Sequence, residues 1–473
     1  MTITRPHLMT AAEIAQRAGG EVVGDPGAAV DAWAFDSRAL GDGACFVALR
    51  GTRNGHDFVP AAFEAGARVA VVDEELPPTF VLRPGRALVR VADALVALQA
   101  VARAARAGRR DLHVVAVAGS TGKTSTKDLL AAALVSRGCH ANAESYNNEF
   151  GLPITLLNAP ASAHVVVTEM GERFPGDLAL LCDIAQPDVG VITNVGLAHA
   201  EHLGGHDGIV AVLSELLDAL PAEGLAVLPA TDPFLPRLAA ATRARVVTVG
   251  ADARADVVVE DVRVDERIRP SFRIRGQDFT VPLHGAHHAE NAALAIAVAC
   301  TAFDLPLGDI AMQLAGATSA RWRMELLDTD DGVTVLNDAY NANPTSMRAA
   351  LSALAHLDVA PGARRIAVLG DMRELGRHHD DAHHEIGAWA AELGIDVVVG
   401  VGAGGRMIVD ATSAGGAAVH AVASAGDAVH IVSSMVRPGD AVLVKGSRAL
   451  ALEQVADDLL ARGRQLGAQG GAA

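Results

Sequence analysis

Two series of apolar runs alternate with helical stretches along this chain, and each run ends in glycine or in polar residues. The first series begins with LHVVAVAG at residue 112 and continues at 164–170, 188–195 and 225–230. The second begins near Met324 and contains VTVLND, RRIAVLGD, DVVVGV and AVLVKGS. Continuous apolar strands that alternate with helices are typical of parallel sheets covered by helices on both faces. The sequence therefore predicts two separate α/β units.

The chain has 473 residues, which is more than a single core of at most about 300 residues supports. Its first part shows short β-rich runs, a capping-box pattern at Thr10–Glu13 and a helix-patterned stretch at 93–107. Between the two α/β units, residues 255–284 resemble antiparallel strands and 285–303 an Ala-rich helix. We expect an α/β protein of three domains: a small mixed α/β N-terminal domain (1–110), a central parallel-sheet domain (111–318) and a C-terminal Rossmann-like domain (319–460), with a disordered tail (461–473).

Composition excludes several classes of protein. Half of the residues are hydrophobic and 20% are charged, which indicates a globular chain. The net charge of −17 argues against sequence-blind nucleic-acid binding, so we expect no nucleic-acid partner. No apolar run approaches the roughly 18 residues of a membrane span, and the N-terminus lacks the apolar core of a signal peptide. Four widely spaced cysteines favour a reducing, cytoplasmic location.

Lysine is scarce: of 39 basic residues, only Lys123, Lys127 and Lys445 are lysines. A coding bias toward arginine explains the scarcity. Because arginine cannot replace lysine where a compact ammonium must fit, the three retained lysines are candidates for function.

A candidate phosphate loop, AGSTGKT, lies at 118–124 between a predicted strand and a predicted helix. Backbone N–H groups in such a turn and the positive end of the helix bind phosphate oxygens, which predicts a P-loop ATPase-like central domain. Lys123 would reach the phosphates, and the Thr124 hydroxyl would bind Mg²⁺. The match is incomplete, because the first glycine of the usual pattern would fall at Val117. For Lys127, four residues after Lys123, a functional role and an ordinary charge on the helix surface are equally good interpretations.

Polar residues follow two further strands of the first series. Glu169 ends one strand, and His199 follows the end of another. Ligands bind outside the carboxyl ends of strands in open parallel sheets. Together with Thr124 these residues predict a Mg²⁺ site, although His199 taken alone reads as a loop histidine.

Seven segments resemble the Mur ligases in their order and spacing, over essentially the whole chain up to about residue 460. They are Gly119–Asp128, Ser145–Pro153, Thr168–Gly171, Ile192–Gly204, Asp338–Met347, Val368–Gly376 and Lys445–Arg448. The strings NNEFGLP, YNANP and GDMRELG are the most specific.

The resemblance implies an ATP- and Mg²⁺-dependent amide ligase of the cytoplasm, acting as a monomer. Its N-terminal domain would hold the UDP-sugar end of UDP-N-acetylmuramoyl-tripeptide, its central domain ATP, and its C-terminal domain the incoming D-alanyl-D-alanine. Members that add diaminopimelate or lysine usually carry an Arg-containing motif where this chain has NANPTSM at 341–347. The resemblance therefore favours the dipeptide-adding member, with another Mur-type or a folylpolyglutamate-type ligase as alternatives.

The resemblance also implies roles for individual residues. The implied catalytic residues are Lys123, His199, Lys445 and Arg448, and the implied metal ligands are Thr124, Glu169 and His199. The implied nucleotide-binding residues are Gly119, Ser120, Thr121, Gly122, Lys123, Thr124, Ser125, Asn291, Arg323 and Asp338. The implied substrate-binding residues are Asp36, Ser37, Arg38, His56, Asn147, Asn148, Tyr340, Asn341 and Asn343.

Several of these residues have plainer interpretations. Asn291 could cap or pack within the Ala-rich helix, and Arg323 could be an exposed charge between domains. Asp338 could be an ordinary turn residue, because aspartate is common in turns. The histidine- and aspartate-rich stretch 378–384 fits a solvated helix face better than a metal site.

One position departs from the resemblance. Mur ligases typically carry a lysine, carbamylated and close to a second Mg²⁺, where this chain has Leu213. No lysine lies between residues 128 and 444, so a carbamate is excluded in that whole segment. We expect an active ligase with an altered metal shell. The alternative is a catalytically impaired homologue that binds without turnover.

Overall fold

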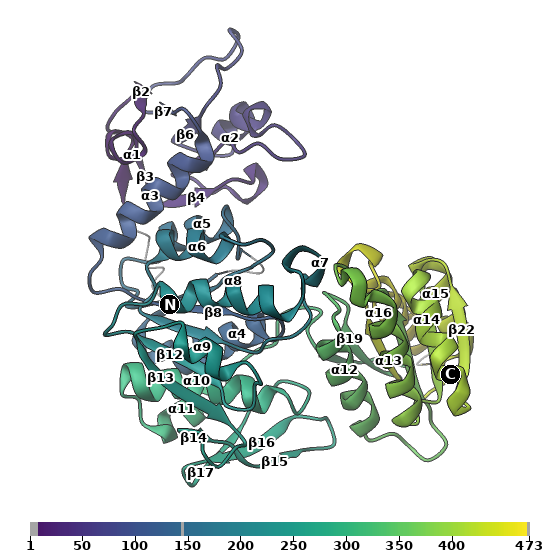
Figure 1. The fold of residues 1–473 in the computed structure, drawn as a ribbon. Helices are drawn as coiled ribbons and strands as arrows, with labels where there is room; N and C mark the ends of the chain where they lie inside the picture. The colour runs from purple at the N-terminus through teal and green to yellow at the C-terminus, as the bar shows by residue number, and fades with distance from the viewer. Residues whose placement is uncertain (1–7, 143–145, 471–473) are drawn as a thin grey trace.

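The computed structural model describes residues 8–142 and 146–470, arranged as three blocks. Figure 1 shows the N-terminal block (purple) above the central block (teal), with the C-terminal block (green to yellow) beside the latter. Helix α7 (Ala200–Leu203) lies toward the C-terminal block. Ser145, the first residue of one of the motifs above, lies outside the described residues.

The N-terminal block is a mixed five-stranded sheet in the order β2-β7-β6-β5-β4, in which only the β2–β7 pair is antiparallel. Helix α1 (Ala11–Ala18) begins at the predicted capping box, because Thr10 and Glu13 bond each other's backbone. The other elements are β1 (Met9–Thr10), β2 (Glu21–Gly24), β3 (Ala29–Val30), β4 (Ala32–Ala34), β5 (Ala44–Val47), α2 (Val59–Glu64), β6 (Val69–Val72), β7 (Ala87–Arg90) and α3 (Ala94–Gly108).

The central block holds a seven-stranded sheet in the order β14-β13-β12-β11-β8-β10-β9, with every neighbouring pair parallel. Its strands are β8 (His113–Ala118), β9 (Cys139–Ala141), β10 (Val165–Glu169), β11 (Val189–Ile192), β12 (Leu225–Pro229), β13 (Arg245–Gly250) and β14 (Val257–Val258). Along β8, Val114 and Ala116 face one apolar cluster, and Val115 and Val117 face another. Both faces are therefore buried, which explains the continuous apolar run.

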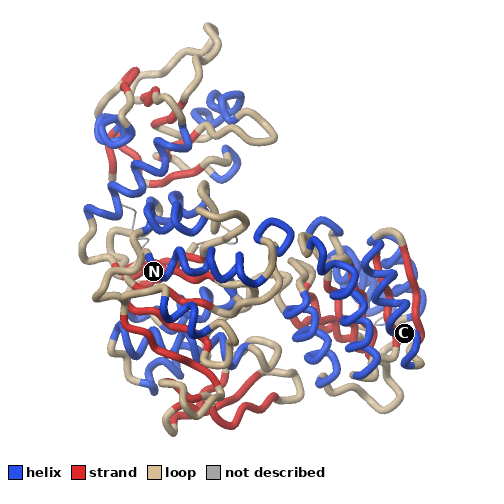
Figure 2. Tube along the Cα trace, viewed as in Figure 1, coloured by secondary structure: helices blue, strands red, loops and turns tan. Residues whose placement is uncertain are grey.

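Helices cover both faces of this sheet, as the tube in Figure 2 shows. They are α4 (Lys123–Ala133), α5 (Gly151–Leu157), α6 (Asp177–Ala185), α8 (His206–Asp218), α9 (Leu235–Ala240), α10 (His288–Phe303) and α11 (Leu307–Leu314). The predicted antiparallel segment forms β15 (Glu260–Val264), β16 (Pro270–Ile274) and β17 (Gln277–Thr280). Its first residues differ from the prediction, because β14 joins the parallel sheet instead.

The C-terminal block holds a six-stranded sheet in the order β18-β19-β23-β20-β21-β22. Its elements are β18 (Glu325–Asp328), β19 (Thr334–Asp338), α12 (Pro344–His356), β20 (Arg365–Gly370), α13 (His379–Glu392), β21 (Val397–Val401), α14 (Gly402–Thr412), β22 (Ala418–Val422), α15 (Ala425–Met435) and β23 (Ala441–Lys445). The prediction of a parallel sheet was wrong for one pair: β18 and β19 are antiparallel. Only five residues join these strands, and a parallel crossover needs a dozen or more.

The expectation of a disordered tail over 461–473 was also wrong for most of its length. Helix α16 (Glu453–Gly470) continues to residue 470, and residues 471–473 lie outside the description. Val455, Ala456 and Leu459 anchor its first half in the core beside the C-terminal sheet. Among the described residues, no helix is long and apolar enough to cross a membrane.

Candidate functional site

A cavity of about 1250 Å³ lies at the carboxyl ends of the central strands and is lined by residues of the central and the C-terminal block. The central block contributes the loop after β8, the end of β10 and the segment before α7. The C-terminal block contributes the segments after β19 and β23. The chain leaves β8 toward β9 and β10 on one side and places β11 on the other, so the loop after β8 lies where the strand order reverses. Ligands of open α/β sheets bind at such a point.

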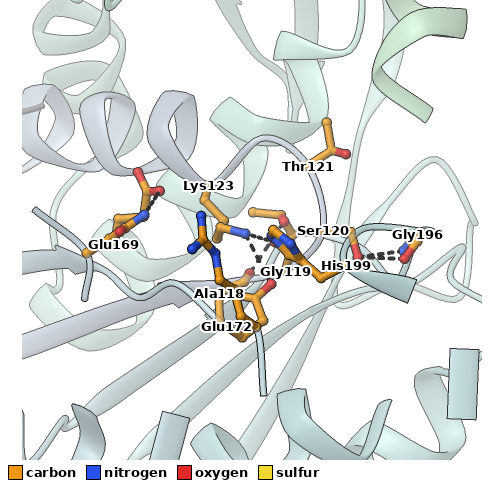
Figure 3. A network of polar contacts seen from close by, with 12 residues as sticks. Ala118, Gly119, Ser120, Thr121, Lys123, Glu169, Glu172, Gly196 and His199 are labelled. Atoms are coloured by element: carbon orange, nitrogen blue, oxygen red, sulfur yellow. Dashed lines mark hydrogen bonds and ion pairs between the residues drawn. The ribbon is translucent and has the colours of Figure 1, made fainter. Parts of the chain in front are cut away.

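The predicted phosphate loop forms the floor of the cavity between β8 and α4. Gly119 and Gly122 have φ of 128° and 86°, and a Cβ on Gly119 would lie 2.2 Å from Thr193 Oγ1. Only glycine fits both demands. The Lys123 ammonium donates to the Gly119 carbonyl at 2.5 Å and to Glu172 Oε1 at 3.1 Å (Figure 3). The loop is thus folded with its lysine turned back over it.

The predicted metal ligands line this cavity together. Thr124 Oγ1 donates to Glu169 Oε2 at 2.7 Å, and the Asn147 amide donates to Glu169 Oε1 at 2.7 Å. His199 Nδ1 contacts the Glu374 carboxylate across the junction between the blocks. Burial, followed by repulsion from Lys123, lowers the pKa of His199, while Glu374 raises it. A hydroxyl, a carboxylate and an imidazole form a donor set that fits a divalent cation.

Glu172 is a site residue that the sequence analysis missed. Its side chain is only 2% exposed, and Oε2 has no hydrogen-bond partner. Burial raises the pKa of Glu172 to about 7, Lys123 opposes this shift, and the nearby Glu169 carboxylate adds to it. The only signal in the sequence was its position directly after the TEMG motif.

The predicted nucleotide-binding residues other than Gly119 line the cavity. The Arg323 guanidinium donates to Thr124 Oγ1 at 3.2 Å and lies 3.9 Å from the centre of the Tyr340 ring. The Asn291 amide lies against the phosphate loop, because a Cβ on Gly122 would be 2.8 Å from its oxygen.

Asp338 and Lys445 are opposite one another on β19 and β23, and their side chains pair at 2.5 Å. Lys445 also donates to the Asn341 carbonyl at 2.9 Å. Burial lowers the pKa of Lys445, and Asp338 opposes that shift. The Asp338–Lys445 pair lines the cavity, and its two opposite charges neutralise each other. Arg448 is half exposed, bonds Glu453 at 2.7 Å and lies over the Trp322 ring.

Asn343 connects the two blocks directly. Its Nδ2 donates to Thr121 Oγ1 at 2.9 Å and to the Ser120 carbonyl at 3.3 Å, and its Oδ1 accepts from Ser346 N at the start of α12. One side chain therefore caps a C-terminal helix and docks that helix on the phosphate loop.

The remaining predicted residues fall into two groups. Asn148, Tyr340 and Asn341 line the cavity, with Asn148 also accepting from Gly151 N at the start of α5. Gly119 lies beneath the loop, and four residues of the N-terminal block do not line the cavity: Asp36, Ser37, Arg38 and His56.

His56 lines a second, smaller cavity and is close to Asp73 and Glu74. Both ring nitrogens are engaged, since Nδ1 contacts Asn54 Oδ1 at 2.8 Å and Nε2 accepts from Asp73 N at 3.1 Å. Arg50 bonds both carboxylates at 3.0 Å. This cluster is satisfied without a metal ion.

One plainer interpretation fails, and another holds only in part. Lys127 is not a surface charge: its side chain is 5% exposed, bonds the Asn142 carbonyl at 2.9 Å and pairs with Asp128. Within the polar stretch 378–384, His383 is fully buried and its Nε2 accepts from Met372 N at 2.9 Å. Helical periodicity turns this one histidine inward while its neighbours at 380, 381 and 384 are exposed.

Leu213 lies on α8 in the apolar core, fully buried, and does not line the cavity. Arg373 and Glu374 do line it, and both were present in the GDMRELG motif without an assigned role.

Comparisons with known proteins agree with this architecture. Residues 117–299 match the Mur ligase middle domain, and residues 322–448 match the Mur ligase, glutamate ligase domain. The UDP-N-acetylmuramoyl-tripeptide--D-alanyl-D-alanine ligase of Mycobacterium tuberculosis is 38% identical, over 90% of this chain and 91% of that protein.

Two solved structures are similar along almost the whole chain. MurF from Acinetobacter baumannii has a TM-score of 0.84 at 28% identity and covers 96% of this chain and 99% of its own. The MurF ligase from Thermotoga maritima, solved in complex with ADP, has a TM-score of 0.75 at 26% identity and covers 92% and 98%.

Proposed function

Because the chain belongs to the Mur ligase family, we propose that it joins D-alanyl-D-alanine to UDP-N-acetylmuramoyl-tripeptide in an ATP-dependent ligase reaction that serves peptidoglycan synthesis. The relatives named for this reaction cover nine-tenths of the chain, and the similar MurF structures support the same activity. A folylpolyglutamate-type ligase is disfavoured by the same findings.

The reaction needs an activated carboxylate. The carboxylate oxygen of the tripeptide attacks the γ-phosphorus of ATP, which gives an acyl phosphate and releases ADP. The free amine of D-alanyl-D-alanine then attacks the acyl carbon, loses a proton, and expels phosphate as the amide bond forms. The protein's part is to position the three reactants and to offset negative charge.

The phosphate loop supplies the first of these tasks. The backbone N–H groups of residues 122–124 would hold the phosphates of ATP at the start of α4, whereas those of Ser120 and Thr121 donate to Asn194. Of the three N–H donors of Lys123, two are used by Gly119 and Glu172, which leaves one for a phosphate oxygen. Asn291 and Arg323 line the same cavity and would contact the nucleotide.

A divalent cation, which we propose to be Mg²⁺, would be held by Thr124, Glu169 and His199. When bound it supplies positive charge that polarises the transferring phosphoryl group. The observed Thr124–Glu169 hydrogen bond places hydroxyl and carboxylate oxygens close together for that purpose.

We assign the remaining tasks to the outer blocks. The N-terminal block would bind the UDP-sugar through Asp36, Ser37, Arg38 and His56, with residues 1–110, 111–318 and 319–460 as the functional domains. Asn147, Asn148, Tyr340 and Asn341 would contact the peptide substrates at the wall of the cavity. Lys445 and Arg448 would approach the reacting groups as the C-terminal block closes. We propose a monomer in a reducing compartment, in keeping with four free cysteines.

The observation that carries the proposal is the cavity itself, in which the phosphate loop faces the NANP segment of the C-terminal block across the Asn343–Thr121 contact. The test is phosphate release with UDP-N-acetylmuramoyl-tripeptide, ATP and Mg²⁺, with and without D-alanyl-D-alanine. We expect release that depends on the dipeptide and matches pentapeptide formation. Release that responds only to single amino acids would contradict the assignment, and no release with any acceptor would favour the impaired homologue.

A further inference from the structure

The cavity contains a buried carboxylate that the proposed reaction does not yet use. Glu172 contacts Lys123 through Oε1 at 3.1 Å, whereas Oε2 is buried without a hydrogen-bond partner. Buried carboxylate oxygens are costly unless they are paired or bind a cation. Among the described residues that line the cavity, no other carboxylate has such an oxygen.

The local chain places Glu172 beside the proposed metal ligands. Glu169 ends β10, and the chain turns over the next two residues, where Gly171 N donates to the Asn147 carbonyl at 2.8 Å. A Cβ on Gly171 would lie 3.2 Å from the Asn147 side chain, so glycine allows this close turn. As a result, the carboxylates of Glu169 and Glu172 face one cavity and repel one another.

Positive side chains already lie beside these carboxylates. Lys123 pairs with Glu172, and Arg323 donates to Thr124 Oγ1 next to Glu169, whereas a bound nucleotide would add phosphate charge. A divalent cation between the carboxylates and the phosphates would offset that added charge, with oxygen ligands that such cations prefer.

The position that usually supplies an additional carboxylate in related enzymes is unable to do so here. Leu213 is fully buried in the apolar core and cannot form a carbamate. Glu172, by contrast, is a buried carboxylate at the cavity wall.

We propose that Glu172 is a ligand of the divalent cation that accompanies the nucleotide. The inference rests on the proposed function for the presence of a nucleotide and a cation. It adds a ligand from this chain's own sequence to the set of Thr124, Glu169 and His199.

The test measures Mn²⁺ binding to the full-length protein saturated with ADP, by electron paramagnetic resonance, for the wild type, Glu172→Gln and Glu172→Asp. Glutamine preserves the shape and removes the charge, so we expect the Mn²⁺ affinity of Glu172→Gln to fall by at least about tenfold. Aspartate retains the charge on a shorter side chain and should recover part of that loss. Glu290→Gln, which removes another carboxylate from the same cavity wall, should bind Mn²⁺ as the wild type does.

A structural role for Glu172 predicts a different pattern. If Glu172 only positions Lys123, Glu172→Gln would weaken ADP binding in the presence of a chelator and leave the Mn²⁺ affinity of the ADP complex unchanged, which would overturn the proposal. An equal loss in Glu290→Gln would overturn it too, because general charge would then explain the effect. Near-ultraviolet circular dichroism checks that each variant keeps the native packing.

This Mn²⁺ measurement uses no peptide substrate, so it remains informative if the chain fails to ligate D-alanyl-D-alanine.

Discussion

At the residue scale, the only three lysines of the chain have different roles. Lys123 turns over the phosphate loop at the cavity, whereas Lys127 is buried behind it and Lys445 is matched with Asp338. The three lysines differ in their burial and in their ion-pair partners. The position of a lysine in a motif predicts neither property.

Lys123→Ala should lower the turnover number by at least about 100-fold, because charge stabilisation of the transferred phosphoryl group is lost. Thermal stability should fall as well, because the buried Glu172 carboxylate loses its ion-pair partner. Steady-state phosphate release and thermal unfolding measure the two effects.

Lys127→Met is the matched variant: it should destabilise the fold by about 1–3 kcal/mol, because the Asn142 carbonyl and Asp128 lose their buried partner. Unchanged turnover in Lys123→Ala would remove its proposed role.

Leu213→Lys should lose stability and gain no activity. A lysine there must enter an apolar core, which we expect to cost about 3 kcal/mol in free energy of unfolding. Urea unfolding measures the loss, and Leu213→Met is the control that keeps the volume, with an expected cost below about 1.5 kcal/mol. Higher ligase activity in Leu213→Lys than in an inert wild type would instead support the impaired homologue.

At the scale of elements, the start of α10 combines structural and site roles. His287 is the N-cap of the Ala-rich helix α10, His288 is the first residue of that helix, and both line the cavity. Burial lowers the pKa of His287 to about 4, Asp338 opposes that shift, and Lys445 adds to it. Burial also lowers the pKa of His288 well below its usual value.

The free energy of unfolding should therefore fall as the pH is lowered from about 6.5 to about 4. In that range the unfolded chain binds protons at these imidazoles and the folded chain does not, so protonation favours unfolding. The contribution of His287 should be on the order of 2 kcal/mol, which urea unfolding at several pH values measures. His287→Asn should flatten the slope, and His430→Asn, at an exposed position, should not. Identical slopes in all three proteins would show that His287 takes up its proton in the folded state.

At the scale of the whole molecule, the site exists only where the central and C-terminal blocks meet. The contacts there include Asn343 with the phosphate loop, Glu374 with His199, and Arg323 with Thr124, and Leu197 packs against the apolar core of the C-terminal block. Interfaces of this kind between domains permit relative motion, which suits a site that must admit three reactants.

Asn343→Ala should reduce catalysis more than its loss of a helix cap explains. The missing cap costs about 1 kcal/mol of stability, and the missing contacts with Ser120 and Thr121 should raise the KM for ATP severalfold. Ser424→Ala is the matched control, because it removes the cap of α15 without touching the phosphate loop. Thermal unfolding measures the loss of stability, and kinetics at varied ATP concentration measure the change in KM. Equal kinetics in both variants would show that the docking contact has no catalytic consequence.

The sequence by itself determined the main parts of the fold. The apolar runs predicted β8, β10, β11 and β12, because a strand buried on both faces needs apolar residues throughout. The capping box at Thr10 was also correct, since it depends only on local hydrogen bonds. The antiparallel β18 was missed although its five-residue connection to β19 excludes a parallel crossover, and the length of α16 was missed because packing against the C-terminal core decides it.

For the candidate site, the sequence identified the residues that motifs carry, and the phosphate loop, Glu169, His199 and Asn343 do line one cavity. Only the tertiary structure revealed that Glu172 is buried with an unpartnered oxygen and that Leu213 points into the core. A motif records which residue types occur at which spacing. Burial and charge pairing depend on which distant segments meet, and they decided which of the cavity's carboxylates remains free to bind a cation.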